Sequence, residues 1–499
     1  MQVSDKAPGL ESQDVDYDVL QEAQAGAGAG TARDDDDMHR MGKIQDSNSQ
    51  GLTNGGMAGL FWSFIWTFIG FGFIIASLSE MASMAPTSGG QYHWVSEFSA
   101  PRYQKFLSYI TGWMSVLAWQ AGSASGSFLT GTIIQGLISI RDPNYIPENW
   151  QGTLFVFAMI LVIYIFNVHA SNLMPVLNNL LMILHILSWA VVVIALWALA
   201  PHQHAKAVFT QWENLGGWSS MGLSVMIGQI SAIYASLSSD ATAHMSEEVK
   251  DAGRSVPVAI AWGYFSNGLM AVVVLIAYLF SMPSVDDALN DATGFPFLYV
   301  FENAVSTAGV NGLTAIILLP VIFSNILFNA STSRQTFAFA RDKGLPFSKW
   351  ISKVDEKRKI PVNAIVLSCI ISCLLSLINI GSQTAFNAII SLNVAALMYT
   401  YIISISCVIY RKIWHADTLP PCRWDMGRWG LPVNIVGLVY CCFSFFWSLW
   451  PSSLPVTLDT FNWSVVIFGG VFMTSLGMYV FKGRKQYAGP AVILLRLQD

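Results

Sequence analysis

The stretch MIGQISAIYASLSSDATAHMSEE, residues 226–248, is the most informative part of the chain for its fold. It begins as an apolar helix, yet five small residues make it a poor continuous one: Gly228, Ser231, Ser236, Ser238 and Ser239. We expect residues 231–240 to form a break in a helix at membrane depth, where freed backbone N–H and C=O groups can bind a small molecule. The alternative is that these small residues only let neighbouring helices pack closely.

The composition around this stretch is that of a membrane protein. Apolar residues make up 53% and charged residues 11% of the 499 residues, and the mean hydropathy is +0.48. Ordinary soluble domains carry about 25% charged residues, so the composition argues against a cytosolic globular enzyme. The net charge of −5 disfavours nucleic-acid binding. GxSxG, HExxH and Walker motifs are absent and no cysteines have zinc spacing, so we expect no enzyme, no cofactor and no metal site.

Eleven uncharged apolar stretches are candidate membrane spans, because about 20 helical residues cross a bilayer core of about 30 Å. They lie near residues 57–79, 106–140, 152–168, 173–200, 215–239, 256–281, 310–333, 360–380, 384–410, 431–450 and 461–481. The uncharged run from 360 to 410 is too long for one span, and we expect it to divide at NIGSQT, residues 379–384.

The charges outside the spans define three regions. Residues 1–50 carry 11 acidic and 4 basic residues and few large apolar ones, which predicts a disordered acidic tail. Residues 51–481 form the membrane domain, and residues 482–499 a C-terminal tail. One set of alternate loops holds 20 Lys and Arg residues and the other set 2. Basic loops stay in the cytoplasm, so the C-terminus is expected there, in a multi-pass protein of the plasma membrane.

This topology leaves the N-terminal tail on the wrong side. With eleven spans the tail would face outside, although it carries no export signal. Either the tail is translocated, or one span is absent between Lys43 and Gly51, where IQDSNSQ leads directly into GLTNGG. We favour the absent span.

Few polar residues lie at membrane depth, and such residues usually face a cavity or a partner. His185 lies midway along the 173–200 span and is a candidate proton relay, or else a residue hydrogen-bonded between helices. Asp240 ends the 215–239 span. Glu247 and Glu248 follow beside Lys250 and Arg254, where they form either a salt-bridged gate or a solvated run of charges.

Aromatic and glycine residues each allow two interpretations. Trp113, Trp119 and Tyr234 could hold a cationic group through cation–π contacts, or could anchor the protein at the membrane interface. Glycines in the 106–140 span are expected to serve close helix packing, and they are Gly122, Gly126, Gly131 and Gly136.

Three long motifs resemble one known family. SLSEMASMAPTSGGQYHWVSEFSAPRYQKFLSYITGW (77–113), SSDATAHMSEEVKDAGRSVPVAI (238–260) and STSRQTFAFARDKGLPFSKWISKV (331–354) are similar to the fungal amino-acid/choline permeases. That group contains GABA permeases and choline transporters and belongs to the amino acid-polyamine-organocation superfamily. The similarity extends over residues 51–485, with a further segment, ARDDDDMHRMGK, at 32–43.

The resemblance implies an all-α polytopic membrane protein with a LeuT-like inverted-repeat bundle. Such a bundle has twelve helices, of which the first and sixth are unwound around the substrate; eleven spans are visible here. Ser238, Ser239 and Asp240 occupy the place of a Gly-aromatic-Asp step in relatives, and the two serines depart from that pattern. The first helix of relatives is missing, in agreement with the charge argument, so we expect this chain to transport poorly.

The implied function is import of an amino acid, GABA or choline by alternating access; we expect coupling to a proton, and the sequence leaves sodium open as the alternative. The expected substrate-binding residues are Tyr234, Ser236, Ser238, Ser239, Asp240 and Trp119, and the expected coupling or gating residues are His185, Glu247 and Glu248.

Two other functions compete with transport. One is a non-transporting isoform or nutrient sensor derived from a permease, which the missing helix favours. The other is a membrane-embedded enzyme that uses His185 or His244, although no nucleophile or metal set accompanies either residue in the sequence.

Overall fold

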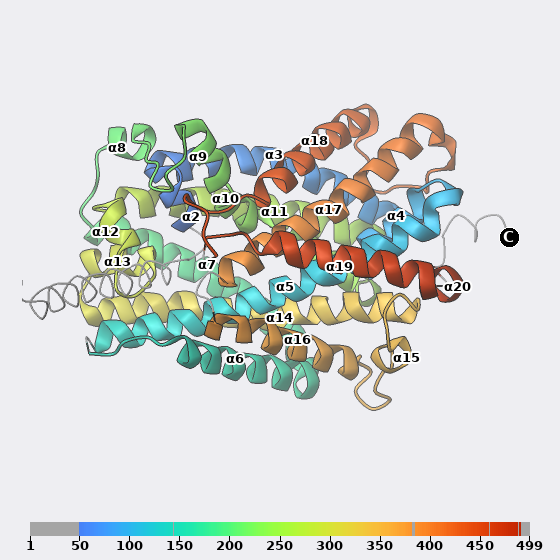
Figure 1. Ribbon diagram of the computed structural model, residues 1–499, viewed down its shortest axis with the longest axis horizontal. Coiled ribbons are helices and arrows are strands. Elements are labelled where there is room, and N and C mark those ends of the chain that lie inside the picture. Colours follow the sequence, from blue (N-terminus) through green and yellow to red (C-terminus); the bar gives the residue numbers. More distant parts are fainter. Residues whose placement is uncertain (1–48, 143, 382–384, 459, 488, 491–499) are drawn as a thin grey trace, which may run out of the picture.

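The computed structural model describes residues 49–142, 144–381, 385–458, 460–487 and 489–490, and over these ranges every regular element is a helix. The long helices run roughly parallel to the longest axis of the molecule (Figure 1). The expected tail of residues 1–50 and the expected junction at 43–51 lie outside the described residues, except for their last few positions. Ser49 and Gln50 belong to a short helix and not to a tail.

Thirteen helical segments build the bundle. They are α3 (Gly56–Met84), α5 (Pro101–Arg141), α6 (Asn149–His169), α7 (Met174–Leu199), α9 (Met221–Gly228), α10 (Ile230–Ser236), η2 (Ser239–Glu248), α11 (Ala252–Phe280), α14 (Thr307–Arg341), α16 (Val362–Gly381), α17 (Ala385–Trp414), α18 (Gly430–Ser448) and α19 (Ser464–Met478).

Shorter helices connect or cap them. They are α2 (Ser49–Thr53), α4 (Gln91–Phe98), η1 (Ser171–Leu173), α8 (Ala205–Thr210), α12 (Val285–Leu289), α13 (Pro296–Ala304), α15 (Ser348–Ile351), η3 (Ala416–Thr418), η4 (Gly427–Trp429), the π-helical η5 (Tyr479–Gly483) and α20 (Arg484–Gln486).

All eleven predicted spans are helical in the structure. Within the described part of the chain, nine segments are long and apolar enough to cross a membrane. The other two predicted spans are α5, which has 41 residues and many polar ones, and α16, whose apolar part is Val362–Ile378. The predicted 215–239 span starts later, at Met221, and is divided into α9, α10 and η2. α16 ends at Gly381 and α17 begins at Ala385, and residues 382–384, where the 360–410 run is predicted to divide, lie outside the described residues.

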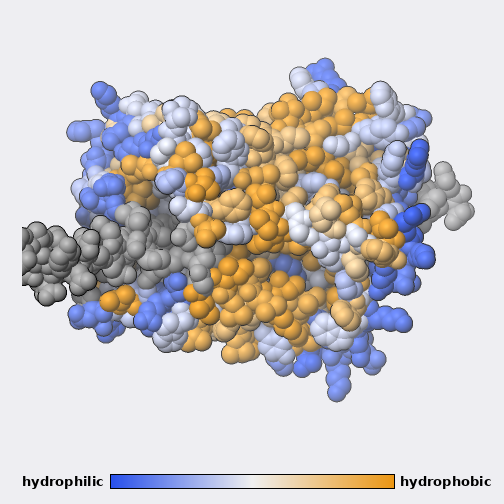
Figure 2. Space-filling model, viewed as in Figure 1, coloured by the Kyte–Doolittle hydropathy of each residue, from blue (hydrophilic) through white to orange (hydrophobic). Residues whose placement is uncertain are grey.

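The two ends of the bundle differ in charge. α4, α15 and α20, which adjoin the loops rich in Lys and Arg, gather at one end, and α8, α12 and α13 lie at the opposite end (Figure 1). We call the first the basic end. An apolar surface occupies the middle of the molecule and hydrophilic residues cover both ends (Figure 2). This pattern is that of a protein that spans a bilayer along its long axis.

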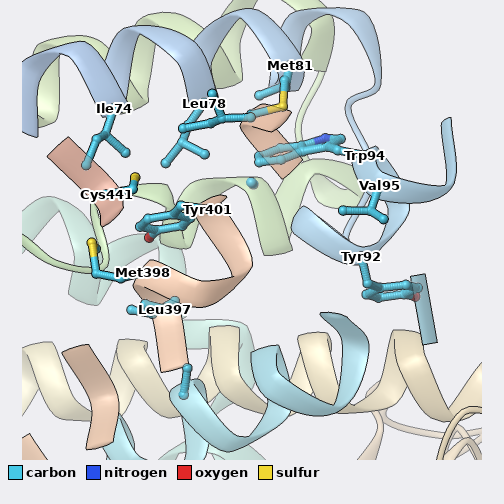
Figure 3. Packing of buried hydrophobic residues seen from close by; sticks show 14 of the residues in the cluster. Ile74, Leu78, Met81, Tyr92, Trp94, Val95, Leu397, Met398, Tyr401 and Cys441 are labelled. Carbon is cyan, nitrogen blue, oxygen red and sulfur yellow. The ribbon is translucent and has the colours of Figure 1, made fainter. Parts of the chain in front are cut away.

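The largest buried cluster lies toward the basic end, where α3, α4, α5 and α17 meet. Figure 3 shows Ile74 and Leu78 of α3 pointing toward Tyr401 of α17, with Trp94 of α4 beside them. Tyr401 and Trp94 are 1% and 0% exposed. Burying such large aromatic side chains fixes the position of α4, and therefore of the loop that precedes it.

α5 is joined to α14 by a ladder of side-chain amides. Asn325 of α14 donates to the Gly126 carbonyl at 2.8 Å, Asn329 donates to Ser123 Oγ at 3.0 Å, and Gln335 donates to Ser115 Oγ at 3.0 Å. Hydrogen bonds between buried groups hold helices in register where the solvent is lipid. α5 and α14 therefore form one rigid unit.

The glycines of α5 allow this close approach. A Cβ on Gly126 would lie 1.8 Å from Asn325 Oδ1, and one on Gly122 would lie 2.6 Å from the Phe328 ring. Gly131 and Gly136 face other helices: a Cβ on them would lie 3.0 Å from Val156 N of α6 and 2.9 Å from Leu298 Cδ1 of α13, respectively. These contacts support the packing role expected for the four glycines.

The segment after α19 is part of the bundle. Tyr487 is 1% exposed, its hydroxyl is 2.8 Å from Ser108 Oγ, and its ring contacts Tyr109 and Phe339. Lys105 Nζ donates to the Arg484 carbonyl at 2.8 Å. The predicted tail of residues 482–499 thus begins as a docked segment; residues 488 and 491–499 lie outside the described part of the chain.

Candidate functional site: a broken helix clasped at one end

The broken helix changes its backbone conformation at two residues. α10 ends at Ser236, Leu237 is extended, and Ser238 is left-handed with φ +64° before η2 begins at Ser239. A left-handed conformation is unfavourable for serine compared with glycine. The break predicted within 231–240 is therefore present and is confined to Leu237 and Ser238.

Exposure changes sharply along this segment. Ile233 and Asp240 are fully buried, Ala235 is exposed, and Leu237, Ser238 and Ser239 are partly exposed. The hydroxyls of Ser236 and Ser239 bond to backbone carbonyls of their own segment, those of Ala232 and Ser236. The break thus presents backbone to an accessible surface at the centre of an apolar span.

Asp240 is the only acidic residue in the described span Met221–Glu247 before Glu247, and it is 0% exposed. Its Oδ1 accepts a hydrogen bond from the Tyr401 hydroxyl of α17 at 2.9 Å. Its Oδ2 accepts a hydrogen bond from Gln91 Nε2 at the start of α4. Both carboxylate oxygens are therefore engaged by neutral donors from two other helices.

His244 and Glu247 face the loop before α4. The Nδ1 atom of His244 is 2.9 Å from the Ser88 carbonyl, so Nδ1 carries the hydrogen and donates. Ser88 Oγ donates to Glu247 Oε1 at 2.6 Å, and Arg341 of α14 donates to both Glu247 oxygens at 3.2 and 3.3 Å. Glu247 forms an ion pair, and its partner is Arg341 and not the neighbouring Lys250 or Arg254.

Asp240, His244 and Glu247 therefore all bind one four-residue segment. We call residues 88–91, Ser-Gly-Gly-Gln, the clasp. Gly90 has φ +54° and ψ −126°, a conformation that favours glycine, and a Cβ there would lie 2.7 Å from His244 Cε1. Two sequence motifs far apart in the chain, at 77–113 and 238–260, bind each other through this segment.

A partly buried acid, Asp342, lies next to the clasp, outside the spans. The Tyr92 hydroxyl of α4 donates to Asp342 Oδ2 at 2.9 Å. Burial raises the pKa of the Asp342 carboxyl above its ordinary range, although the Tyr92 hydrogen bond and Arg341 oppose the change. Burial also raises the pKa of Tyr92 well above its usual value, with Asp342 adding to the effect.

The predicted aromatic residues do not form one cage. Trp119 is 0% exposed. Its ring packs edge-on against His244, with centroids 4.6 Å apart, and at a tilt against Phe328, with centroids 4.9 Å apart. The hydroxyl of Tyr234 is 2.9 Å from Ser125 Oγ of α5. Trp113 bonds instead to the Gly344 carbonyl at 3.1 Å, in the loop after α14. Trp119 and Tyr234 thus line the contact between the broken helix and α5, and Trp113 lies elsewhere.

His185 and Glu248 are not part of the clasp contacts. His185 is exposed on α7, and its Nε2 is 3.2 Å from Asn267 Oδ1 of α11, which matches the alternative of a hydrogen bond between helices. Glu248 ends η2, and its side chain lies outside what the structure describes.

The opposite end of the broken helix is held by Asn54, which is 0% exposed. Asn54 Oδ1 accepts from Ser224 Oγ of α9 at 3.4 Å and from Trp218 Nε1 at 3.0 Å, and its Nδ2 donates to the Ser452 carbonyl at 2.9 Å. Nearby, the Gly51 N–H of α2 donates to Ser231 Oγ of α10 at 3.0 Å. These anchors are all neutral.

Sequence reasoning missed Gln91, Tyr401, Ser88 and Arg341. Gln91 and Ser88 lie in the SGGQ segment, whose paired glycines signal an unusual backbone. Tyr401 and Arg341 carry no local signal, because they lie 161 and 94 residues from their partners in the sequence. Within the described residues, no group of three or more His, Cys, Asp or Glu could hold a metal ion.

These features define a class: a multi-pass membrane transporter with one helix broken beside a buried acid. The amino acid permease family model matches residues 46–472, and the chain belongs to that family. It is similar to the choline transporter of Saccharomyces cerevisiae, at 28% identity over 89% of this chain and 78% of that protein. It is also similar to the amino-acid permease BAT1 homolog of Oryza sativa subsp. japonica, at 30% identity over 83% and 82%.

A solved structure shows the same fold. A mutant manganese transporter from Eremococcus coleocola superimposes with a TM-score of 0.52 at 13% sequence identity, covering 88% of this chain and 91% of that one. The fold is thus that of the LeuT-like transporters, as the sequence predicted. The relatives are transporters and permeases, so this is a transporter family and not an enzyme family.

Proposed function

We propose that the protein imports an amino acid or a related small amine, such as GABA or choline, across the plasma membrane by proton-coupled alternating access. The observation that carries this proposal is the break at Leu237–Ser238, partly exposed within an apolar span beside α5 and α14. The relatives named choline transporter and amino-acid permease support this range of substrates.

The two sides of the break offer complementary groups to a zwitterion. The C-terminal end of α10 carries the negative end of the helix dipole, which favours a cationic head group. The first N–H groups of η2 favour a carboxylate. Tyr234, which is partly exposed, adds aromatic surface on the α5 side, where a cation–π contact is worth about 0.5 to 2 kcal/mol, and the fully buried Trp119 supports the site from behind.

Alternating access requires one group of helices to move against another. The amide ladder makes α5 and α14 a scaffold, and α3, α9–η2 and α11 form the moving group. Glu247 and Arg341 join the two groups at the basic end, where the clasp also closes on η2. Opening this end toward the cytoplasm requires these polar contacts to separate, which is easier than separating a packed apolar core.

The test is uptake of labelled GABA, choline and amino acids by cells that express the full chain. Ser238→Gly should retain uptake because glycine accepts φ +64°, whereas Ser238→Val should lose at least about 90% of it, since a β-branched residue opposes that conformation. Ser475→Val, at a buried serine of α19, is the matched control and should behave like the parent. Equal uptake by all three variants would overturn the role of the break.

The same cells test the orientation. We propose that the basic end faces the cytoplasm, as the distribution of Lys and Arg favours. An epitope in the loop between Asp355 and Lys359 should then be accessible only after the cells are permeabilised. Labelling of intact cells would reverse the topology.

A second candidate is a nutrient receptor or inactive isoform. The feature that favours it is the sequence between Lys43 and Gly51, where a first span is predicted to be absent. The predicted absence of a first span would weaken transport without removing the broken helix. Binding of GABA or choline to the purified chain, without uptake in cells, would identify this function; uptake would exclude it.

A further inference from the structure

Asp240 is poorly placed to bind a substrate directly. It is fully buried, and each of its carboxylate oxygens already accepts a hydrogen bond, one from Tyr401 and one from Gln91. An ammonium group that approached Asp240 would have to displace one of these donors. The partly exposed residues are its neighbours Ser238 and Ser239.

We propose that Asp240 is the proton-binding site that couples transport to the proton gradient, and that it acts through the clasp rather than as a substrate ligand. This inference rests on the proposed function for its role in transport. The proton site itself is defined by contacts that exist whether or not the chain transports.

The chemistry of the neighbours favours a proton over a metal cation. A metal cation needs several oxygen ligands, whereas Gln91 and Tyr401 point N–H and O–H groups at Asp240. Both side chains can also serve the protonated acid. Gln91 Oε1 has no hydrogen-bond partner within the described residues, so rotation of the amide would let it accept from the new carboxyl O–H.

The other titratable groups around Asp240 are few in the part of the chain that the structure describes. His244 lies four residues later in η2 and interacts electrostatically with Asp240. α17 places the Tyr401 hydroxyl against Asp240, and Cys441 of α18 lies beside Tyr401. Of the charges on α14, Arg341 pairs with Glu247, and Arg334 donates to the Ala330 carbonyl of its own helix.

Protonation would loosen the clasp by a simple exchange. One proton adds to an Asp240 oxygen and forms an O–H bond, and two hydrogen bonds to a carboxylate become hydrogen bonds to a neutral acid. Bonds to ionised groups are roughly twice as strong as neutral ones. Contacts of η2 with α4 and α17 weaken together, and the basic end opens. Loss of the proton to the cytoplasm restores them.

The first experiment measures this loosening without any substrate. Hydrogen exchange of the full chain in nanodiscs is followed, between about pH 5 and pH 8, in peptides covering residues 85–98 and 237–248 and corrected for intrinsic rates. Protection in both segments should fall together as the pH is lowered. Asp240→Asn should give the low-pH protection at every pH.

Three variants keep the result interpretable. His244→Gln should keep the pH dependence, and Glu247→Gln should lower protection equally at every pH. Tyr401→Phe keeps Asp240 but removes one donor to its ionised form, so the midpoint should move to higher pH. A pH dependence that survives in Asp240→Asn, disappears in His244→Gln or keeps its midpoint in Tyr401→Phe would overturn the proposal.

Transport assays separate this proposal from the proposed function. Asp240→Asn should lose proton-driven accumulation of labelled GABA or choline while retaining exchange of labelled for unlabelled substrate. If the parent chain shows no uptake but exchange protection behaves as expected, the transport function fails and the proton site stands. If Asp240→Asn still accumulates substrate against a gradient, the coupling role is wrong and the transport function stands.

Discussion

The two halves of the broken helix are anchored by different chemistry. η2, toward the basic end, is held through Asp240, His244 and Glu247, all of which can gain or lose charge. α9 and α10, toward the opposite end, are held through neutral groups such as Asn54 and Ser231. The pH and the ionic strength can therefore change the grip on one half and leave the other unchanged. Under the proposed alternating-access mechanism, we expect the basic end to be the gate that responds to pH and salt.

The largest expected effect tests charge at the basic end. Lys412 Nζ lies 2.6 Å from Glu80 Oε2, with side chains 14% and 4% exposed, and joins the ends of α17 and α3. Lys412→Met leaves Glu80 buried without its cation and should destabilise the protein by about 3–5 kcal/mol. Denaturant unfolding in detergent measures the change. The double variant with Glu80→Met should recover part of it, and no recovery would show that the pairing is unimportant.

The next effect tests the neutral end. Asn54→Leu leaves Trp218 Nε1 and the Ser452 carbonyl without their partner and should lower the unfolding free energy by about 1–3 kcal/mol. The loss should be the same at low and at high salt, and it should be the same at every pH tested. Asn303→Leu, at an exposed site on α13, is the control and should change little. A loss for Asn54→Leu that varied with pH would contradict the claim that the α9–α10 half of the broken helix is held by neutral contacts.

A smaller effect is expected at the gate ion pair. Glu247 and Arg341 are 46% and 47% exposed, so their pairing contributes at most about 1 kcal/mol. Glu247→Gln should raise hydrogen exchange at residues 239–248 by up to about fivefold at low salt, and salt should reduce the difference. Glu356→Gln removes an equal charge from the loop after α15 and should have no effect. An unchanged rate in Glu247→Gln would remove this pair from the gate.

The smallest effect concerns Asp342. Because burial raises its pKa in the folded protein, its contribution to stability is fully present below its unfolded pKa of about 3.9 and is lost as the pH rises through the folded value. Asp342→Asn should therefore be slightly more stable than the parent at neutral pH and equal to it in acid. Thermal unfolding at several pH values measures the difference. A less stable variant at neutral pH would show that the Tyr92 hydrogen bond outweighs burial.

Sequence reasoning reached the helical spans because hydropathy and helix length are local properties, and the LeuT-like arrangement came from the resemblance to a known family. The break also has a local cause, since the serines around Leu237 weaken a helix wherever it lies. The partners of Asp240 have no such signal: Gln91 and Tyr401 lie 149 and 161 residues away, and only packing brings them together. The spacing of Asp240, His244 and Glu247 was visible, but its meaning depended on a clasp that no periodicity predicts.

His185 shows a second kind of limit. A polar residue in an apolar span can face the bundle or its outside, and the pattern of neighbours normally decides which. α7 is apolar on all sides, and most of it lies exposed on the outside of the bundle. The sequence therefore carries no information about which face of α7 is inside. The hydrogen bond to Asn267 became visible only in the structure.

The docking of Tyr487 has a practical consequence for engineered forms of the protein. Hydropathy would place a safe cut or fusion point soon after Phe481, yet Tyr487 and Pro490 are buried, and Tyr487 touches helices of the scaffold. A reporter domain inserted before Tyr487 would pull Tyr487 out of its contacts with α5 and α14. A reporter placed after Pro490 leaves Tyr487 docked. It can therefore report expression and location without disturbing the contact between Tyr487 and the scaffold helices α5 and α14.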